Sequence, residues 1–167
     1  MYIGPQGIVH GTTITVMNTA RKFTKGPLEG KLFVTAGLGG MSGAQPKAAK
    51  IAGLVSISAE INAAAAEKRH AQGWVDRLVC TADEALDLAL EAQAVRGNTS
   101  IAFVGNTVDL WEKLVERNVH VDLGSDQTSL HNPWAGGYYP QGFTYDEAND
   151  LMASDPEKFR TEVQATL

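Results

Sequence analysis

Short apolar runs alternate with longer segments of helical periodicity along most of the chain. The runs are of strand length and rich in aliphatic residues. They cover Leu32 to Ala36, Leu54 to Ala59, Val75 to Cys80, Ser100 to Val104 and Val119 to Leu123. The segments between them, Asn62 to Gln72, Thr81 to Arg96 and Thr107 to Glu116, are typical of helices. This alternation predicts an α/β domain with a doubly wound parallel sheet of five strands.

Helical segments also flank the predicted sheet at both ends. Thr12 to Lys22 has helical character before the first strand, and capping-box pairs after the sheet predict two more helices. These pairs are Thr144 with Glu147 and Ser154 with Glu157, and the two helices are expected near Thr144 to Ala153 and Asp155 to Leu167. Thr81 with Glu84 is a further capping-box pair, at the start of the Thr81 to Arg96 helix. No stop signal precedes Leu167, so we expect residues 1–167 to be a single domain excised from a longer chain.

The turn after the first predicted strand is rich in glycine. The sequence GLGGMSG, from Gly37 to Gly43, leads into an alanine-rich helix, and the second apolar run ends on Glu60. Glycines allow a sharp turn and close approach of a diphosphate, and an acid after the second strand can accept hydrogen bonds from ribose hydroxyls. We therefore expect a Rossmann-type dinucleotide site. Ser42 stands where the third glycine of the usual pattern belongs, and Gly40 is expected to need a positive φ or a close ligand.

A polar segment, Leu123 to Gly142, follows the last predicted strand. Irregular segments of this length in a compact domain are usually functional or disordered. Its two tyrosines and one tryptophan, set among glycines and prolines, argue against disorder. Because ligands lie at the carboxyl ends of strands in doubly wound sheets, the segment is a candidate binding loop. A surface loop held by its own turns is the alternative.

The amino-acid composition of the chain limits the kinds of binding partner and the cellular compartment that we expect. Of the 167 residues, 44% are hydrophobic and 20% charged, and the net charge is −5, so a nucleic-acid partner is not expected. No apolar run has the length of a membrane span, and the lone Cys80 fits a reducing compartment, which indicates a cytoplasmic protein. Cys80 is expected to be a core thiol, Lys68 and Arg69 part of a solvated face and His70 solvated. No metal-ligand spacing is present.

Four segments together resemble the urocanase (urocanate hydratase) family. They are TAGLGGMSGAQPKAA, AEINAAAAEKRHAQGW, LGSDQTSLHNPWAGGYYP and EANDLMASDPEKF, and the resemblance covers essentially the whole chain. It implies the central NAD-binding domain of a longer, cytoplasmic, homodimeric enzyme of histidine degradation. In this family NAD⁺ acts as an electrophile while water adds to urocanate, giving 4-imidazolone-5-propionate.

The resemblance also implies which residues contact NAD. The diphosphate turn falls on Gly40, Met41 and Ser42, and Glu60 binds the ribose. The remaining matches are Asn106, Thr107, Gln127, Thr128, Ser129, Leu130, His131, Tyr138 and Tyr139. Ala65 stands where some members carry an arginine, whose contact Lys68 or Arg69 could replace. The family's catalytic residues belong to segments outside this sequence, so no catalytic residue is expected here and the chain alone is expected to be inactive.

Other functions compete with the hydratase. An NAD-dependent dehydrogenase would need an acid or base beside the nicotinamide, for which His131 is a candidate. A dinucleotide-binding module without chemistry of its own fits the absence of an assembled nucleophile or acid–base pair. A methyltransferase sheet is a further alternative, which the helical C-terminal region disfavours.

Overall fold

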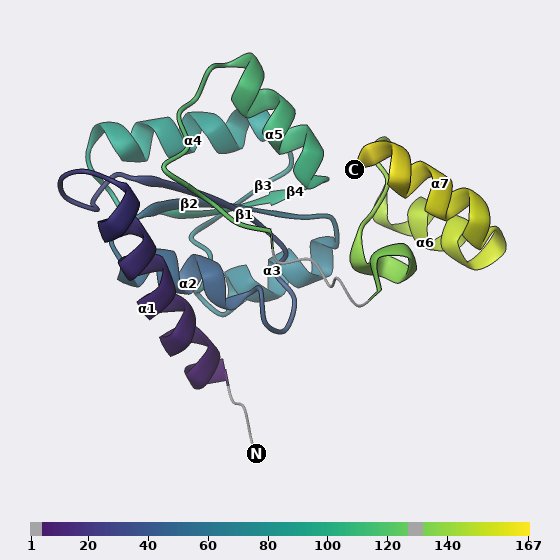
Figure 1. Cartoon of the computed structure of the whole chain (residues 1–167), viewed down its shortest axis with the longest axis horizontal. Coiled ribbons are helices and arrows are strands. Elements are labelled where there is room, and N and C mark those ends of the chain that lie inside the picture. The colour runs from purple at the N-terminus through teal and green to yellow at the C-terminus, as the bar shows by residue number, and fades with distance from the viewer. Residues whose placement is uncertain (1–4, 127–131) are drawn as a thin grey trace.

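A central parallel sheet organises the chain (Figure 1). The computed structural model describes residues 5–126 and 132–167, and the sheet has the order β3-β4-β2-β1-β5. The strands are β1 (Leu32–Ala36), β2 (Val55–Glu60), β3 (Arg77–Val79), β4 (Ser100–Val104) and β5 (Leu123–Gly124). All four pairings are parallel. The predicted five-stranded doubly wound α/β fold is confirmed.

Helices cover both faces of the sheet. In Figure 1, α1, α2 and α3 lie on one face, and α4 and α5 lie on the other. Their bounds are α1 (Pro5–Phe23), α2 (Ala44–Ile51), α3 (Ala63–Ala71), α4 (Ala82–Ala94) and α5 (Thr107–Glu116). The largest core cluster lies between the sheet and α4 and α5, and the small side chains Ala85 and Ala89 let α4 approach the strands closely. Residues of both faces are therefore shielded, as a parallel sheet requires.

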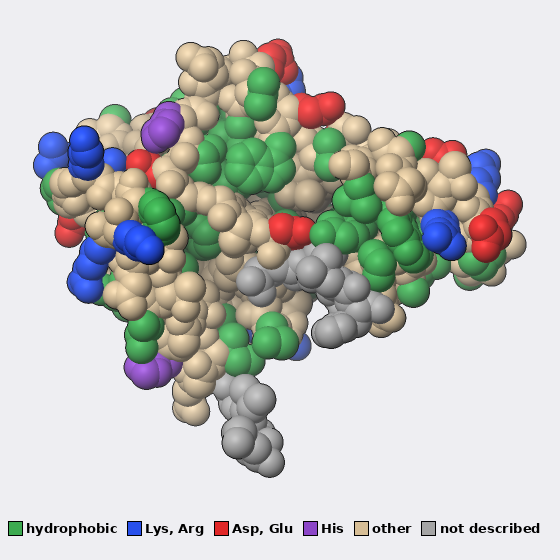
Figure 2. Space-filling model, in the orientation of Figure 1, with side chains coloured by type: hydrophobic (Ala, Val, Ile, Leu, Met, Phe, Trp, Pro, Cys, Tyr) green, Lys and Arg blue, Asp and Glu red, His purple; other side chains and the backbone are tan. Residues whose placement is uncertain are grey.

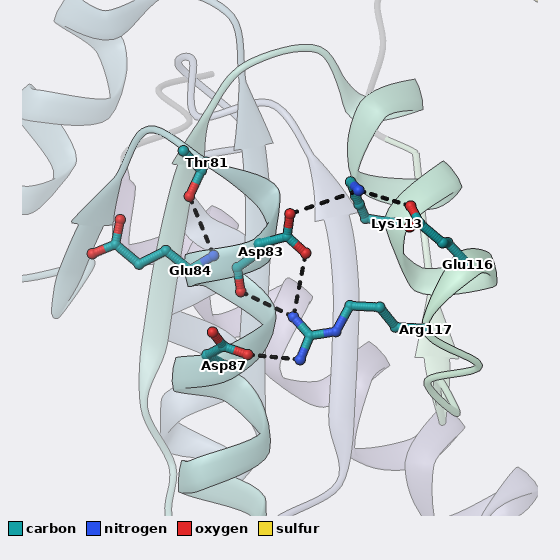
Figure 3. Close-up of polar contacts among 7 residues, drawn as sticks. All are labelled: Thr81, Asp83, Glu84, Asp87, Lys113, Glu116 and Arg117. Carbon is teal, nitrogen blue, oxygen red and sulfur yellow. Dashed lines mark hydrogen bonds and ion pairs between the residues drawn. The ribbon is translucent and has the colours of Figure 1, made fainter.

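Ion pairs join α4 and α5 on the outer surface (Figure 3). Arg117 reaches from the end of α5 to Asp87, with Nη2 and Oδ1 2.6 Å apart, and also contacts Asp83. Lys113 lies 3.7 Å from Asp83 and 2.7 Å from Glu116. Because these groups face solvent, the network contributes little to stability.

The C-terminal helices form a small unit beyond the carboxyl ends of the strands (Figure 1). A π-type turn, η1 (Pro133–Gly137), packs with α6 (Tyr145–Ser154) and α7 (Pro156–Thr166) around the buried Phe159 and Val163. Gln141 attaches this unit to α5, because its Nε2 donates to Asp109 and Glu112 at 2.8 Å each. The unit therefore lies against the edge where the strands end.

Several predicted boundaries were wrong. The first helix begins at Pro5 rather than Thr12, and the last strand is only Leu123–Gly124 rather than Val119 to Leu123. The predicted capping box of Ser154 and Glu157 does not form. Instead, Asp155 caps α7 by accepting the N–H of Lys158 at 3.0 Å. Pro156 suits the first helical position, which places the cap on the residue before it. The Thr144 and Glu147 capping box is confirmed.

Candidate functional site

The turn between β1 and α2 presents a row of backbone donors. Gly37 has φ +87°, a left-handed conformation that favours glycine, and its N–H donates to Ala59 O at 2.7 Å. The next donors to bond within the protein are Leu38, and then Gly43, whose N–H reaches Gly39 O at 3.2 Å. The N–H groups of residues 39–42 donate to none of the described residues. Consecutive unpaired N–H groups before a helix form a binding site for anions.

Of the two expectations for Gly40, a positive φ or a close ligand, the first is not met. Gly40 is absent from the positive-φ glycines of the described residues, and a Cβ built on it meets nothing within 4 Å. The left-handed position of this turn is Gly37. Open space at Gly40 remains compatible with close approach of a ligand, because a side chain there would project from the outer surface of the turn. Met41, which is 68% exposed, is also on this surface.

Glu60 links the end of β2 to this turn. Its Oε2 accepts the N–H of Leu38 at 2.6 Å, and its Oε1 accepts the N–H of Asn62 at 2.9 Å. Each carboxylate oxygen can accept a further hydrogen bond, so Glu60 can still bind hydroxyl groups. Glu60 therefore has a structural role in the turn, and its contact with a ribose stays a prediction.

Behind the turn lies a buried arginine whose burial was not expected. Arg69 of α3 is 9% exposed rather than part of a solvated face, and its guanidinium donates to the carbonyls of Leu38 and Gly39. Burial lowers the pKa of Arg69 from its ordinary value. The predicted solvent exposure holds for Lys68 and His70. The pattern of polar residues within α3 could not show that Arg69 faces the turn, because that depends on how the helix packs.

A small cavity of about 110 Å³ lies at the carboxyl ends of β1, β2 and β4. Gly37, Glu60, Asn106, Thr107 and Tyr139 contribute to its lining. The Oγ1 of Thr107 is buried and has no hydrogen-bond partner among the described residues. A buried hydroxyl is usually paired. The cavity therefore offers the Glu60 carboxylate to a polar ligand, and its lining includes Thr107, whose unpaired hydroxyl is covered by protein atoms.

Asn106 uses both ends of its side chain within the protein. Its Oδ1 accepts the N–H of Val108 at 3.0 Å and caps α5, while its Nδ2 donates to Tyr139 O at 3.0 Å. Asn106 thereby fixes the tyrosine segment against the sheet edge. A direct contact of Asn106 with a cofactor stays a prediction.

The two predicted tyrosines differ in environment. Tyr138 donates its hydroxyl to Asp126 Oδ2 at 2.8 Å, and Tyr139 donates to Asn149 Oδ1 at 3.2 Å. Burial, followed by the neighbouring Tyr145, raises the pKa of Tyr139 to about 12, so its hydroxyl stays protonated at neutral pH. Only Tyr139 lines the small cavity. The predicted contacts Gln127, Thr128, Ser129, Leu130 and His131 lie outside the described residues.

A larger cavity of about 440 Å³ lies beside α1 and the end of β5. Its lining includes Met41, Gln45 and Ser125. Ser125 Oγ donates to Gln45 Oε1 at 2.8 Å, and the Nε2 of Gln45 is buried with no partner among the described residues. The segments after β1 and β2 lead to α2 and α3 on one face, and those after β3 and β4 lead to α4 and α5 on the other (Figure 1), so the winding reverses between β2 and β4, beside the small cavity. Doubly wound sheets bind ligands at this switch point.

The structure also bears on the lone cysteine, on metal binding and on membrane spanning. Cys80 is exposed, so the predicted core thiol was wrong, because β3 is a short strand at the sheet edge. Among residues 5–126 and 132–167, no cluster of three His, Cys, Asp or Glu side chains could hold a metal ion. Within the same ranges, no helix has the length and apolar character needed to cross a bilayer. On the face shown in Figure 2, Lys and Arg lie mainly toward the two ends of the molecule.

Comparison with known proteins gives one consistent result. The family model described as the urocanase Rossmann-like domain matches residues 4–167. Over 99% of the chain, the sequence is 56% identical to a probable urocanate hydratase of Caenorhabditis elegans and 55% identical to one of Dictyostelium discoideum. It is 51% identical to urocanate hydratase of Homo sapiens. The chain spans 25% of the length of each of these curated relatives.

Proposed function

This chain belongs to the urocanase family, and on that premise we propose that it is the NAD-binding domain of a urocanate hydratase. One observation carries the proposal: the N–H groups of residues 39–42, unpaired among the described residues, follow Leu38, whose own N–H is bonded to the Glu60 carboxylate. This is the donor and acceptor arrangement that a dinucleotide requires at its diphosphate and its ribose. A dehydrogenase or a binding module could share it, so the hydratase reaction rests on the family.

The residues of the chain have separate roles in this proposal. The N–H groups of Gly40, Met41 and Ser42 bind the diphosphate, helped by the positive end of the α2 dipole. Glu60 accepts the ribose hydroxyls, and the hydroxyl of Thr107 supplies a further polar contact in the small cavity. Tyr139 forms one wall, and Asn106 holds it in place. A cavity of about 110 Å³ holds only part of a dinucleotide, so most of the ligand lies along the surface of the turn.

The other end of the dinucleotide extends toward the paired ends of β1 and β5. There Gln45, whose buried Nε2 has no partner among the described residues, and Ser125 line the larger cavity. Gln127, Thr128, Ser129, Leu130, His131 and Tyr138 are proposed to contact this end. When bound, NAD⁺ supplies an electrophilic nicotinamide ring for the addition of water to urocanate.

Catalysis itself is proposed to need the rest of a longer polypeptide. No acid–base pair is assembled beside the cavity among the described residues, and the tyrosine in its wall stays protonated. The substrate, urocanate, would therefore be held between this domain and other segments. The product 4-imidazolone-5-propionate, the place in histidine degradation, a homodimer and a cytoplasmic location belong to the same proposal.

Titration calorimetry of the 167-residue chain with NAD⁺ and with NADP⁺ tests the binding function. We expect NAD⁺ to bind more tightly, because the Glu60 carboxylate would repel a 2′-phosphate. No binding of NAD⁺ by either this chain or the complete polypeptide would contradict the proposal.

A second assay tests the reaction. The complete polypeptide should lower the ultraviolet absorbance of urocanate without accumulating reduced nicotinamide, whereas the chain alone saturated with NAD⁺ should not. Accumulation of reduced nicotinamide would support the dehydrogenase. Turnover by the chain alone within about tenfold of the complete polypeptide, or roughly 1.4 kcal/mol in barrier, would show that this domain holds the whole site.

A further inference from the structure

The guanidinium of Arg69 lies directly beneath the glycine-rich turn between β1 and α2. Its Nε donates to Leu38 O at 3.0 Å, and its Nη2 donates to Gly39 O. Its Nη1 donates to Gln72 Oε1 at 2.8 Å, and the Trp74 ring covers it at 5.0 Å from Cζ to the ring centre. The planar guanidinium thus holds two successive carbonyls of the turn from one rigid group.

These two bonds set the direction of the donors that follow. In a planar trans peptide, the carbonyl and the next N–H point to opposite sides, and no described peptide bond is cis. Fixing the carbonyls of Leu38 and Gly39 toward Arg69 therefore turns the N–H groups of Gly39 and Gly40 away from the protein interior. Both N–H groups are among those without a partner in the described residues.

The charge of Arg69 has no counter-charge within the described residues. None of their ion pairs includes Arg69, although its side chain is almost fully buried. Buried charges in proteins are normally paired. Here the neighbouring groups are neutral carbonyls, a carboxamide and an indole, so an anion on the outer side of the turn would complete the arrangement.

Gly43 explains how the guanidinium fits. A Cβ at this position would lie 2.2 Å from Arg69 Nε and 2.7 Å from Gly39 O. The backbone of Gly43 is in an ordinary helical conformation, with φ −58°, so glycine is needed for space rather than for its torsion angle. The shift of the third glycine from position 42 to 43 is therefore matched to the presence of Arg69.

We propose that Arg69 is a positioning residue for the dinucleotide diphosphate. It orients the outward N–H groups of the turn through the carbonyls of Leu38 and Gly39, and it adds an uncompensated positive charge behind them. It does not replace the arginine contact missing at Ala65, because its side chain lies beneath the turn. This inference rests on the proposed binding of NAD.

The test measures the affinity of the complete polypeptide for NAD⁺, ADP-ribose and adenosine. In Arg69→Met, the two diphosphate ligands should bind about tenfold to a hundredfold more weakly, as expected for lost hydrogen bonds from a charged group. Adenosine, which has no diphosphate, should lose much less. Hydrogen exchange of Leu38 and Gly43, the hydrogen-bonded amides of the turn, should accelerate while that of β4 stays unchanged, which separates a local effect from general loosening.

Two further variants test whether weaker binding in Arg69→Met comes from the lost contacts rather than from unfolding. Arg69→Lys keeps the charge but cannot reach both carbonyls with one planar group, and Gly43→Ala displaces the guanidinium without removing it; both should weaken NAD⁺ binding in the same direction. If wild type binds NAD⁺ and the folded variants bind it equally well, the proposed positioning role of Arg69 is wrong. Equal losses for adenosine and NAD⁺ would also contradict it. A wild type that binds no NAD⁺ or ADP-ribose would instead contradict the proposed function.

Discussion

The carboxylate of Glu60 accepts the backbone N–H of Leu38 at 2.6 Å, which ties the end of β2 to the turn after β1. One side chain thus serves two purposes in the proposed site. It fixes the inner part of the glycine-rich turn, and it keeps free lone pairs for ribose hydroxyls. Changes at Glu60 should consequently affect both cofactor choice and the conformation of the turn.

Glu60→Gln should weaken NAD⁺ binding and reduce the preference for NAD⁺ over NADP⁺. The amide lacks the charge that repels a 2′-phosphate, and its NH₂ group cannot accept the N–H of Leu38 or Asn62. We expect a loss of about 1.5–3 kcal/mol in NAD⁺ binding, as for a hydrogen bond to a charged group. Titration calorimetry with both cofactors measures it. Glu91→Gln, the same charge change on an exposed part of α4, is the control, and an unchanged cofactor preference in Glu60→Gln would contradict the prediction.

Gly37→Ala should destabilise the domain, whereas Gly40→Ala should leave its stability nearly unchanged. Gly37 has φ +87°, which costs a residue with a Cβ about 1–2 kcal/mol. Gly40 has no such torsion angle, and its Cβ would enter open space. Urea unfolding of the two variants provides the comparison. Equal destabilisation by both would show that this description of the turn is wrong, while the loss of NAD⁺ affinity in Gly40→Ala is expected from a methyl group on the binding surface.

Thr107→Val should weaken NAD⁺ binding without lowering stability. The hydroxyl is buried and unpaired among the described residues, so removing it relieves a desolvation cost of about 1 kcal/mol or less. When NAD⁺ is bound, the variant would lack the proposed contact between this hydroxyl and the cofactor. Ser56→Ala is the matched control, because Ser56 Oγ is also buried and unpaired but lies outside the small cavity. Thermal unfolding and calorimetry should separate the two variants, and an equal NAD⁺ affinity for both would count against a ligand contact at Thr107.

Asp76→Asn should lower stability at neutral pH but not in acid. Burial alone would raise the pKa of Asp76, but hydrogen bonds from Lys50 and Ser100 outweigh it and lower the pKa below its ordinary value. Because the folded pKa is the lower one, this stabilisation is complete above the unfolded pKa of about 3.9 and is lost as pH falls through the folded pKa.

Urea unfolding of wild type and Asp76→Asn from neutral to acid pH measures this effect. The difference should be about 1–2 kcal/mol near pH 7, because Ser100 donates to Asp76 from both N and Oγ. It should shrink below about pH 4. A difference that does not change with pH would contradict the assignment, and Glu91→Gln should show a flat profile.

Sequence periodicity predicted the strands and most helices, because each is a local pattern of apolar and polar positions. The Thr144 and Glu147 capping box was predictable for the same reason, since both partners lie within one turn. The short strand β5 was not, because its length depends on pairing with Phe33 and Val34 of β1, far away in the sequence. Cys80 was assigned to the core wrongly, since only the strand order shows that β3 lies at the sheet edge.

The features of the proposed site also fall into those present in the sequence and those that only the tertiary structure shows. The glycine-rich turn, its distance from Glu60 and the resemblance to urocanase were present in the sequence alone, because chain order and spacing fix them. Only the tertiary structure showed that Glu60 bonds to Leu38, that Asn106 holds Tyr139 and that Arg69 lies beneath the turn. These contacts join segments 22 to 33 residues apart. Packing of helices against the sheet decides which of their polar side chains face inward, and a sequence pattern within one helix does not contain that information.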